Sequence, residues 1–144
     1  MSTLNVTNIT TDALTGQSVG GSIAVTAEGN STTTNLQQGL CKVWQDLNGE
    51  TFGARDSLNI SGNTDNGTGD HTHSYTNNMG NANYTFSGYC GDPNSQMGVI
   101  HIESVASKAT GSIQYVTNFV NNTGGGGANL DCEQILTTAH GDLA

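Results

Sequence analysis

Short alternating runs separated by turn-forming residues constrain this chain most, and they are densest in residues 42–76. Asn48-Gly49 and Asn66-Gly67 both follow strand-like runs. Asn-Gly is favoured in two-residue hairpins because both central positions need φ > 0. We therefore predict two β-hairpins here, with Asn48, Gly49, Asn66 and Gly67 as their turn residues.

The rest of the chain also favours β structure. Apolar residues alternate with polar ones in several short runs, which predicts strands over residues 22–26, 84–90, 97–105, 112–120 and 130–138. Residues 36–47 predict a short helical or irregular entry into a strand. With the hairpins this gives about seven to nine short strands. Such a set is typical of an all-β fold, here a β-sandwich or jelly-roll-like knob.

The predicted core is small, because only 33% of the residues are hydrophobic. A core of this size needs most of the large apolar side chains. We expect it to contain Trp44, Leu58, Ile60, Phe86, Ile100 and Ile102. A chain this poor in apolar residues gains stability when copies share a core, so we also predict a homotrimer.

The first 35 residues have a different composition from the rest. Their apolar residues are scattered and several glycines interrupt them. A segment like this has too little apolar surface to fold alone. We therefore divide the chain into an extended attachment arm with its linker, residues 1–35, and a β-rich knob, residues 36–144. Leu4, Val6 and Ile9 are the expected docking residues of the arm.

Three rings alternate on the arm that follows Asn66-Gly67. His71, His73 and Tyr75 fall on one strand face, with the two imidazoles about 7 Å apart. Three copies meeting at an axis would present six imidazole nitrogens to one transition metal. The alternative, which we favour, is ring packing at a surface or subunit contact. Tyr75, Tyr89 and Tyr115 are candidates for a stacking surface that contacts a receptor, unless the core takes them.

The charge balance excludes several classes of protein. The net charge is −9, with only Lys42, Arg55 and Lys108 positive, which argues against nucleic-acid binding and against anionic membrane surfaces. No apolar run approaches the ~20 residues of a membrane span, and the N-terminus lacks the regions of a signal peptide. We therefore expect that the protein is made in a cytoplasm and that it does not insert into a membrane.

No motif in the sequence selects an enzyme or a cofactor site. Residues 16–20 match G-x-S-x-G, but the scattered apolar residues around them do not predict the strand and helix that flank a serine nucleophile. The sequence contains no P-loop or dinucleotide-binding fingerprint, and no carboxylate pair stands out as a glycosidase acid and base. Asn63, Asp65, Gly67 and Asp70 have the oxygen density of a calcium loop, but a turn explains them without a metal. Cys41, Cys90 and Cys132 are expected to be small core residues. We expect no enzymatic activity and no cofactor.

One long ordered string resembles a known family. Residues 55–70 read R-D-S-L-N-x-S-x-x-T-D-N-G-T-G-D, within a longer match that includes KVW at 42–44 and NANYTFSG at 81–88. This segment resembles a short domain of tail-fibre and other virion proteins of marine phages and cyanophages. The opening MSTLNVTNIT and the closing HGDLA are also similar to the ends of that family's short reading frames. His71 and His73 stand where the family has an aromatic and an aliphatic residue.

The resemblance implies a bacteriophage structural protein on the virion surface. The first interpretation is a trimeric short tail fibre or receptor-binding knob, docked to other virion proteins by its arm and facing a host surface glycan or protein. The second is a capsid cement or decoration protein. The third is a glycan depolymerase.

Overall fold

The computed structural model describes residues 24–26, 33–91, 97–103, 107–120 and 127–144. These residues are almost entirely β structure, and every strand pair is antiparallel. The one α-helix in this part of the chain is α1 (Leu36–Gly39), a single turn. The prediction of an all-β fold with a short helical entry before the first long strand is confirmed.

The chain forms two compact units, Met1–Gln37 and Gln38–Ala144. In the first unit, β1 (Ala24–Thr26) pairs with β2 (Thr33–Asn35) in a two-stranded sheet. Leu4, Val6 and Ile9 lie outside the described residues, so their docking role stays a prediction. The division between units falls two residues after the boundary predicted at residue 35.

The second unit contains one nine-stranded sheet. Its strand order is β4-β3-β11-β7-β8-β9-β6-β5, and β10 pairs with β9 beside this path. The strands are β3 (Val43–Asn48), β4 (Gly53–Leu58), β5 (Ile60–Gly67), β6 (Asp70–Tyr75), β7 (Thr85–Gly91), β8 (Met97–His101), β9 (Ser112–Val120), β10 (Ala128–Asn129) and β11 (Gln134–His140).

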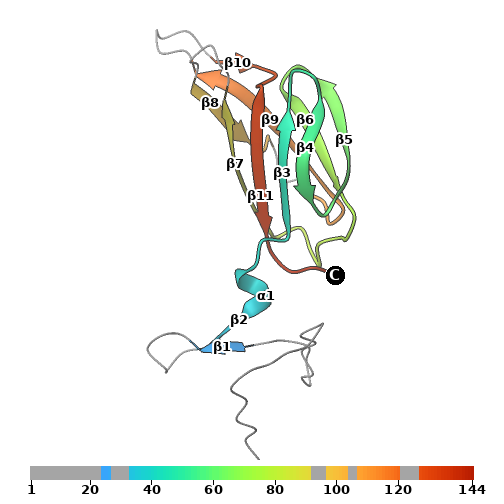
Figure 1. Ribbon diagram of the computed structural model, residues 1–144, viewed down its shortest axis with the longest axis vertical. Helices are drawn as coiled ribbons and strands as arrows, with labels where there is room; N and C mark the ends of the chain where they lie inside the picture. Colours follow the sequence, from blue (N-terminus) through green and yellow to red (C-terminus); the bar gives the residue numbers. More distant parts are fainter. Residues whose placement is uncertain (1–23, 27–32, 92–96, 104–106, 121–126) are drawn as a thin grey trace, which may run out of the picture. The chain divides into compact units, whose positions relative to one another are not determined.

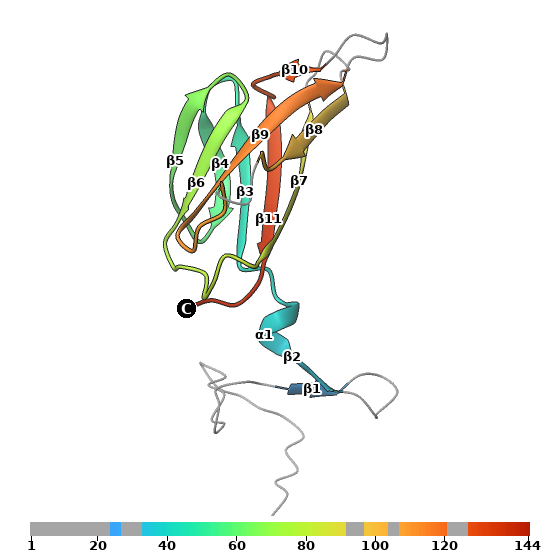
Figure 2. The ribbon, with the colours of Figure 1, turned by 180° about the vertical axis from the view of Figure 1, so that it is seen from behind.

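The sheet curves so that its two halves face each other. Figures 1 and 2 show β6 and β9 on one side of the unit and β3 and β11 on the other. Alternate residues of these four strands point inward and are buried, as expected for strands that are covered on one face. The inward residues are Val43, Gln45 and Leu47 of β3, His71, His73 and Tyr75 of β6, Ile113, Tyr115 and Thr117 of β9, and Ile135, Thr137 and Ala139 of β11.

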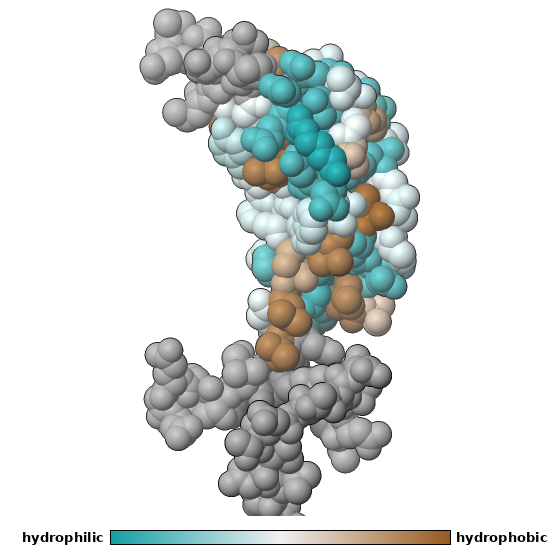
Figure 3. Space-filling model, viewed as in Figure 1, coloured by the Kyte–Doolittle hydropathy of each residue, from teal (hydrophilic) through white to brown (hydrophobic). Residues whose placement is uncertain are grey.

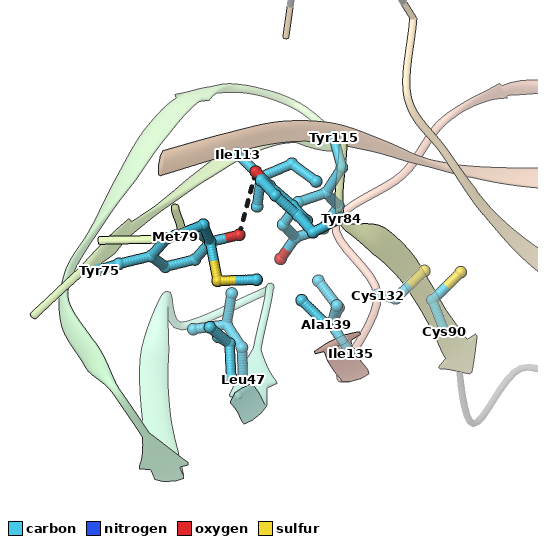
Figure 4. Packing of buried hydrophobic residues seen from close by; sticks show 11 residues of the cluster. Leu47, Tyr75, Met79, Tyr84, Cys90, Ile113, Tyr115, Cys132, Ile135 and Ala139 are labelled. Carbon is cyan, nitrogen blue, oxygen red and sulfur yellow. Dashed lines mark hydrogen bonds between the residues drawn. The ribbon is translucent and has the colours of Figure 1, made fainter. Parts of the chain in front are cut away.

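The apolar part of this interior forms one cluster (Figure 4). Ile60, Phe86, Ile100 and Ile102, four of the predicted core residues, are partly buried and pack against it.

Two predicted core residues are not in the core. Leu58 is 46% exposed, and Trp44 is half-buried and pairs with Leu58 across β3 and β4. The reason is the phase of β3, which turns Val43, Gln45 and Leu47 inward. Trp44 therefore lies on the outer face, while the polar Gln45 takes the inner one.

The hairpin predicted at Asn48-Gly49 forms, but the predicted two-residue turn is wrong. β3 ends at Asn48 and β4 begins at Gly53, so the connection has four residues, and neither Asn48 nor Gly49 has a positive φ. Asn48 Oδ1 accepts a hydrogen bond from the Thr51 amide (2.9 Å), and Phe52 takes the left-handed conformation with φ 52°. Gly49 is needed for another reason, since a Cβ there would lie 2.6 Å from the Cys132 carbonyl oxygen.

The predicted turn at Asn66-Gly67 is displaced by two residues. β5 runs to Gly67 and pairs with Asp70, so Thr68 and Gly69 form the connection to β6. The pairing shifts by one residue between Asp65 and Gly67, which is a β-bulge. Gly67 (φ 135°) and Gly69 (φ 66°) both have positive φ, so the bulge and the turn each use one glycine.

Candidate functional site

The predicted site face on β6 lies inside the protein. His71 and His73 are each 1% exposed and Tyr75 is 5% exposed. The expectation that these rings meet a metal at a trimer axis, or pack at a surface, is therefore wrong for this subunit. Among the described residues there is no group of three or more His, Cys, Asp or Glu side chains that could hold a metal ion. The sequence predicts correctly that the three rings share one face of β6, but this face is the inward one.

His73 is held in the centre of the core. Its Nδ1 lies 2.7 Å from Asn63 Oδ1, and its Nε2 lies 3.4 Å from Thr137 Oγ1 on the opposite half of the sheet. Its ring packs on Tyr115 at a centroid distance of 4.7 Å. Burial, together with the nearby His71, lowers the pKa of His73 to about 3. His73 is thus a neutral ring that connects the two sides of the core.

His71 occupies the next inward position and is neutral for the same reason. Burial lowers the pKa of His71, although the negative charge of Asp131 opposes the shift. Its Nε2 lies 3.4 Å from Thr117 Oγ1 and 4.0 Å from Asp131 Oδ1. A catalytic triad places the hydroxyl and the carboxylate on opposite ring nitrogens, whereas both lie near Nε2 here. The arrangement of His71, Thr117 and Asp131 therefore suits packing rather than a catalytic triad.

Asp131 and Thr117 anchor the turn between β5 and β6. The Gly69 amide donates to Asp131 Oδ1 (2.6 Å), and the Thr117 amide donates to the Gly69 carbonyl oxygen (2.7 Å). Thr117 Oγ1 also donates to the Leu130 carbonyl oxygen (2.6 Å). The turn is therefore fixed by residues from β9 and from the segment before β11, which no local sequence signal identified.

The polar residues of the β5–β6 hairpin bond mostly to one another. Asp70 accepts hydrogen bonds from the side-chain amides of Asn66 (3.2 Å) and Gln114 (2.9 Å). Asp65 Oδ1 accepts one from the Gly67 amide (2.9 Å). These carboxylates stabilise the bulge and the turn. Their hydrogen bonds agree with the interpretation of this segment as a turn, which the sequence favours over a calcium loop.

Only one of the three tyrosines predicted as a contact surface is exposed. Tyr75 and Tyr115 are buried, and Tyr75 Oη donates to Tyr84 Oη at 3.3 Å inside the core. Tyr89 is 58% exposed on the outer face of β7. Its ring lies over Gly91, where an added Cβ would be 2.6 Å from the tyrosine Oη, and Leu136 is its cross-strand neighbour.

The described surface is mainly polar. In Figure 3 hydrophilic residues cover much of the upper part of the visible face, and apolar residues gather toward its lower end. An open hollow of about 400 Å³ lies in this surface, and its walls carry amide, hydroxyl, imidazole and carboxylate groups. It is lined by Asn81, Asn83, Tyr84, Thr85, His140, Gly141 and Asp142.

Comparisons with family models, with curated proteins and with solved structures returned no match. In the described part of the chain, none of the helices has the length and apolar character needed to cross a membrane.

Proposed function

We propose that this protein is a non-enzymatic structural protein of a bacteriophage virion surface, and that it acts as a short tail-fibre or receptor-binding knob. One observation carries the proposal. The string that resembles virion proteins, residues 55–70, covers most of β4, all of β5 and the first residue of β6, and its polar side chains serve to shape that part of the knob. A segment with this role is structural. This agrees with the virion structural protein that the family resemblance implies.

Two of the four histidines and two of the three cysteines are buried, and their burial supports a binding role over catalysis. His71, His73, Cys90 and Cys132 are all buried, so a substrate in solution does not reach them. The acidic, polar surface suits a protein that works outside the cell in contact with water.

The finer architecture is part of the same proposal. The two facing halves of the sheet form a sandwich-like knob, three copies associate in a homotrimer, and residues 1–35 attach it to other virion proteins. Tyr89 is the receptor-facing residue we favour, because its ring is exposed and lies over Gly91 of the same strand. An aromatic ring in this position suits stacking on a sugar or packing on a protein side chain.

Electron microscopy of virions labelled with an antibody to the knob tests the proposal. We expect label at the tail. Label at regular positions on the capsid would contradict a tail fibre and favour the decoration protein. Label on neither structure would contradict both.

A binding assay separates the knob from a depolymerase. We expect the purified protein to bind host cells and to release no reducing ends from host envelope glycans. Tyr89→Ala should weaken binding, whereas Leu143→Ala, which also removes an exposed large side chain, should not. Release of reducing ends would contradict the non-enzymatic function.

A further inference from the structure

Two of the three cysteines meet inside the core. Cys90 is on β7 and Cys132 precedes β11, and they are 0% and 1% exposed. Figure 4 shows their thiols side by side at one end of the apolar cluster. Cys41, Cys90 and Cys132 form no disulfide in this structure.

The surroundings hold the two sulfurs in place. A Cβ added to Gly98 on β8 would lie 2.4 Å from Cys90 Sγ, so the backbone of β8 closes that side of the thiol. Cys132 is fixed through its carbonyl oxygen, which accepts a hydrogen bond from the Gly49 amide (2.9 Å). Two thiols that lie side by side, each on a fixed backbone, are candidates for a disulfide.

We propose that Cys90 and Cys132 are an oxidation site, at which the two thiols become one disulfide when the protein meets a low-molecular-weight disulfide such as oxidised glutathione. One thiolate attacks the small disulfide and releases one small thiol. The second thiolate then attacks the mixed disulfide and releases the other small thiol. The two cysteines are oxidised, the small disulfide is reduced to two thiols, and the two cysteine protons pass to the two released thiols.

The reduced pair reacts slowly while the protein stays folded. Contact with Cys132 and burial raise the pKa of the Cys90 thiol, which keeps it protonated and unreactive. The disulfide therefore forms during folding or local opening. Once formed, it connects β7 to the segment before β11 and closes a loop over residues 90–132. Such a loop restricts the unfolded chain and so stabilises the fold.

Cys41 serves as an internal control. It is half-buried, and its Sγ lies 2.8 Å from Thr138 Oγ1. Trypsin cleavage at Lys42, Arg55 and Lys108 places Cys41, Cys90 and Cys132 on three different peptides, residues 1–42, 56–108 and 109–144. A disulfide between any two of the cysteines is thus identified by which peptides it joins.

The full chain is refolded with oxidised glutathione and then alkylated in denaturant with iodoacetamide. The masses of the intact protein and of its tryptic peptides are then measured. We expect one alkylated cysteine and a linked pair of peptides 56–108 and 109–144. Cys41→Ser should give the same linked pair, and Cys132→Ala should give none. The oxidised protein should melt at least about 5 °C above the reduced protein.

Three outcomes would overturn the inference. Alkylation of all three cysteines after refolding with oxidised glutathione would show that the pair does not oxidise. A linked peptide that contains Cys41 would show that another pair does. A linked pair 56–108 and 109–144 with an unchanged or lower melting temperature would contradict the stabilising role.

Discussion

Gly69 is the residue of the β5–β6 hairpin with the least room for a side chain. A Cβ there would lie 2.5 Å from the Thr117 carbonyl oxygen and 2.7 Å from the Leu130 amide, and φ is 66°. Gly67 also has a positive φ, but a Cβ at that position meets nothing within 4 Å. The two glycines therefore separate the cost of backbone conformation from the cost of crowding.

We predict that Gly69→Ala lowers the free energy of unfolding by about 3 kcal/mol or more, from conformation and crowding together. Gly67→Ala should cost about 1–2 kcal/mol, from conformation alone. Urea denaturation measures both. Equal losses in the two variants would show that the turn moves freely away from Thr117.

The buried histidines predict a stability that falls in mild acid. Unfolded histidine has a pKa near 6.5, while that of folded His73 is about 3, so below pH 6.5 the unfolded chain binds more protons than the folded one. The free energy of unfolding should be flat with respect to His73 above pH 7. It should be lower by about 2–3 kcal/mol at pH 4.5. His71 adds a loss in the same direction.

His73→Gln isolates this contribution, because the amide is neutral at every pH and the carboxylates titrate in both proteins. Urea denaturation at pH 7 and pH 4.5 should show a smaller loss in the variant than in the parent. The same loss in both proteins would mean that His73 is not the proton-binding group.

At the residue scale, the sequence predicted which side chains share a strand face but not which face is inward. Trp44 was expected inside because it is large and apolar, yet Gln45 and the two histidines are inside instead. Which face of a strand is inward depends on contacts with strands far along the chain. An example is the contact of Thr137 with His73 across the core. Local hydrophobicity does not carry that information.

At the scale of elements, Asn59 makes the corner between β4 and β5. It takes the left-handed conformation (φ 61°), and its side chain bonds to the backbone of Asn77 through both Nδ2 (3.0 Å) and Oδ1 (2.7 Å). Asn59, Gly67 and Gly69 all belong to the string of residues 55–70. The string thus contains two changes of chain direction and both register shifts of the β5–β6 pairing.

We predict that Asp131→Ala destabilises the hairpin by about 1–2 kcal/mol, because the Gly69 amide loses its acceptor. Asp131→Asn should cost less, since an amide oxygen still accepts the bond. Urea denaturation compares the two variants. If both variants lose the same stability, the charge of Asp131 near His71 matters more than the acceptor.

Strand positions were more predictable than their connections. Residues 112–120 were predicted as a strand and are β9, because their apolar alternation is long and regular. The hairpin turn was misplaced by two residues, since Asn66-Gly67 suits a turn locally while the contacts of Gly69 with Thr117 fix it elsewhere. The strand order was not predictable, because β11 lies between β3 and β7, which are far from it in the sequence.

At the scale of the whole molecule, every residue of the apolar cluster comes from the second unit. We therefore predict that a variant lacking residues 1–35 still folds, with a cooperative melting transition, but no longer joins the virion. Circular dichroism and virion assembly measure the two effects. A truncated protein that assembles normally would contradict the role of the arm, and one that does not fold would contradict the independence of the knob.

The predicted homotrimer is tested by sedimentation at micromolar concentration. The chain has a mass of 14.9 kDa, so we expect a species about three times heavier. A stable monomer would contradict the trimer. Salt should have little effect on the assembly if its contacts are mainly apolar, since screening acts on charges.

The open path of the large sheet leaves β4 and β5 as its terminal strands. An unpaired strand edge is a template on which another molecule can polymerise into fibrils. Both edges here resist such growth. β4 carries Arg55 and Asp56, and the pairing of β4 and of β5 is interrupted by register shifts that bend a strand away from flat contact. A protein so rich in strand can therefore resist edge-to-edge polymerisation at high concentration.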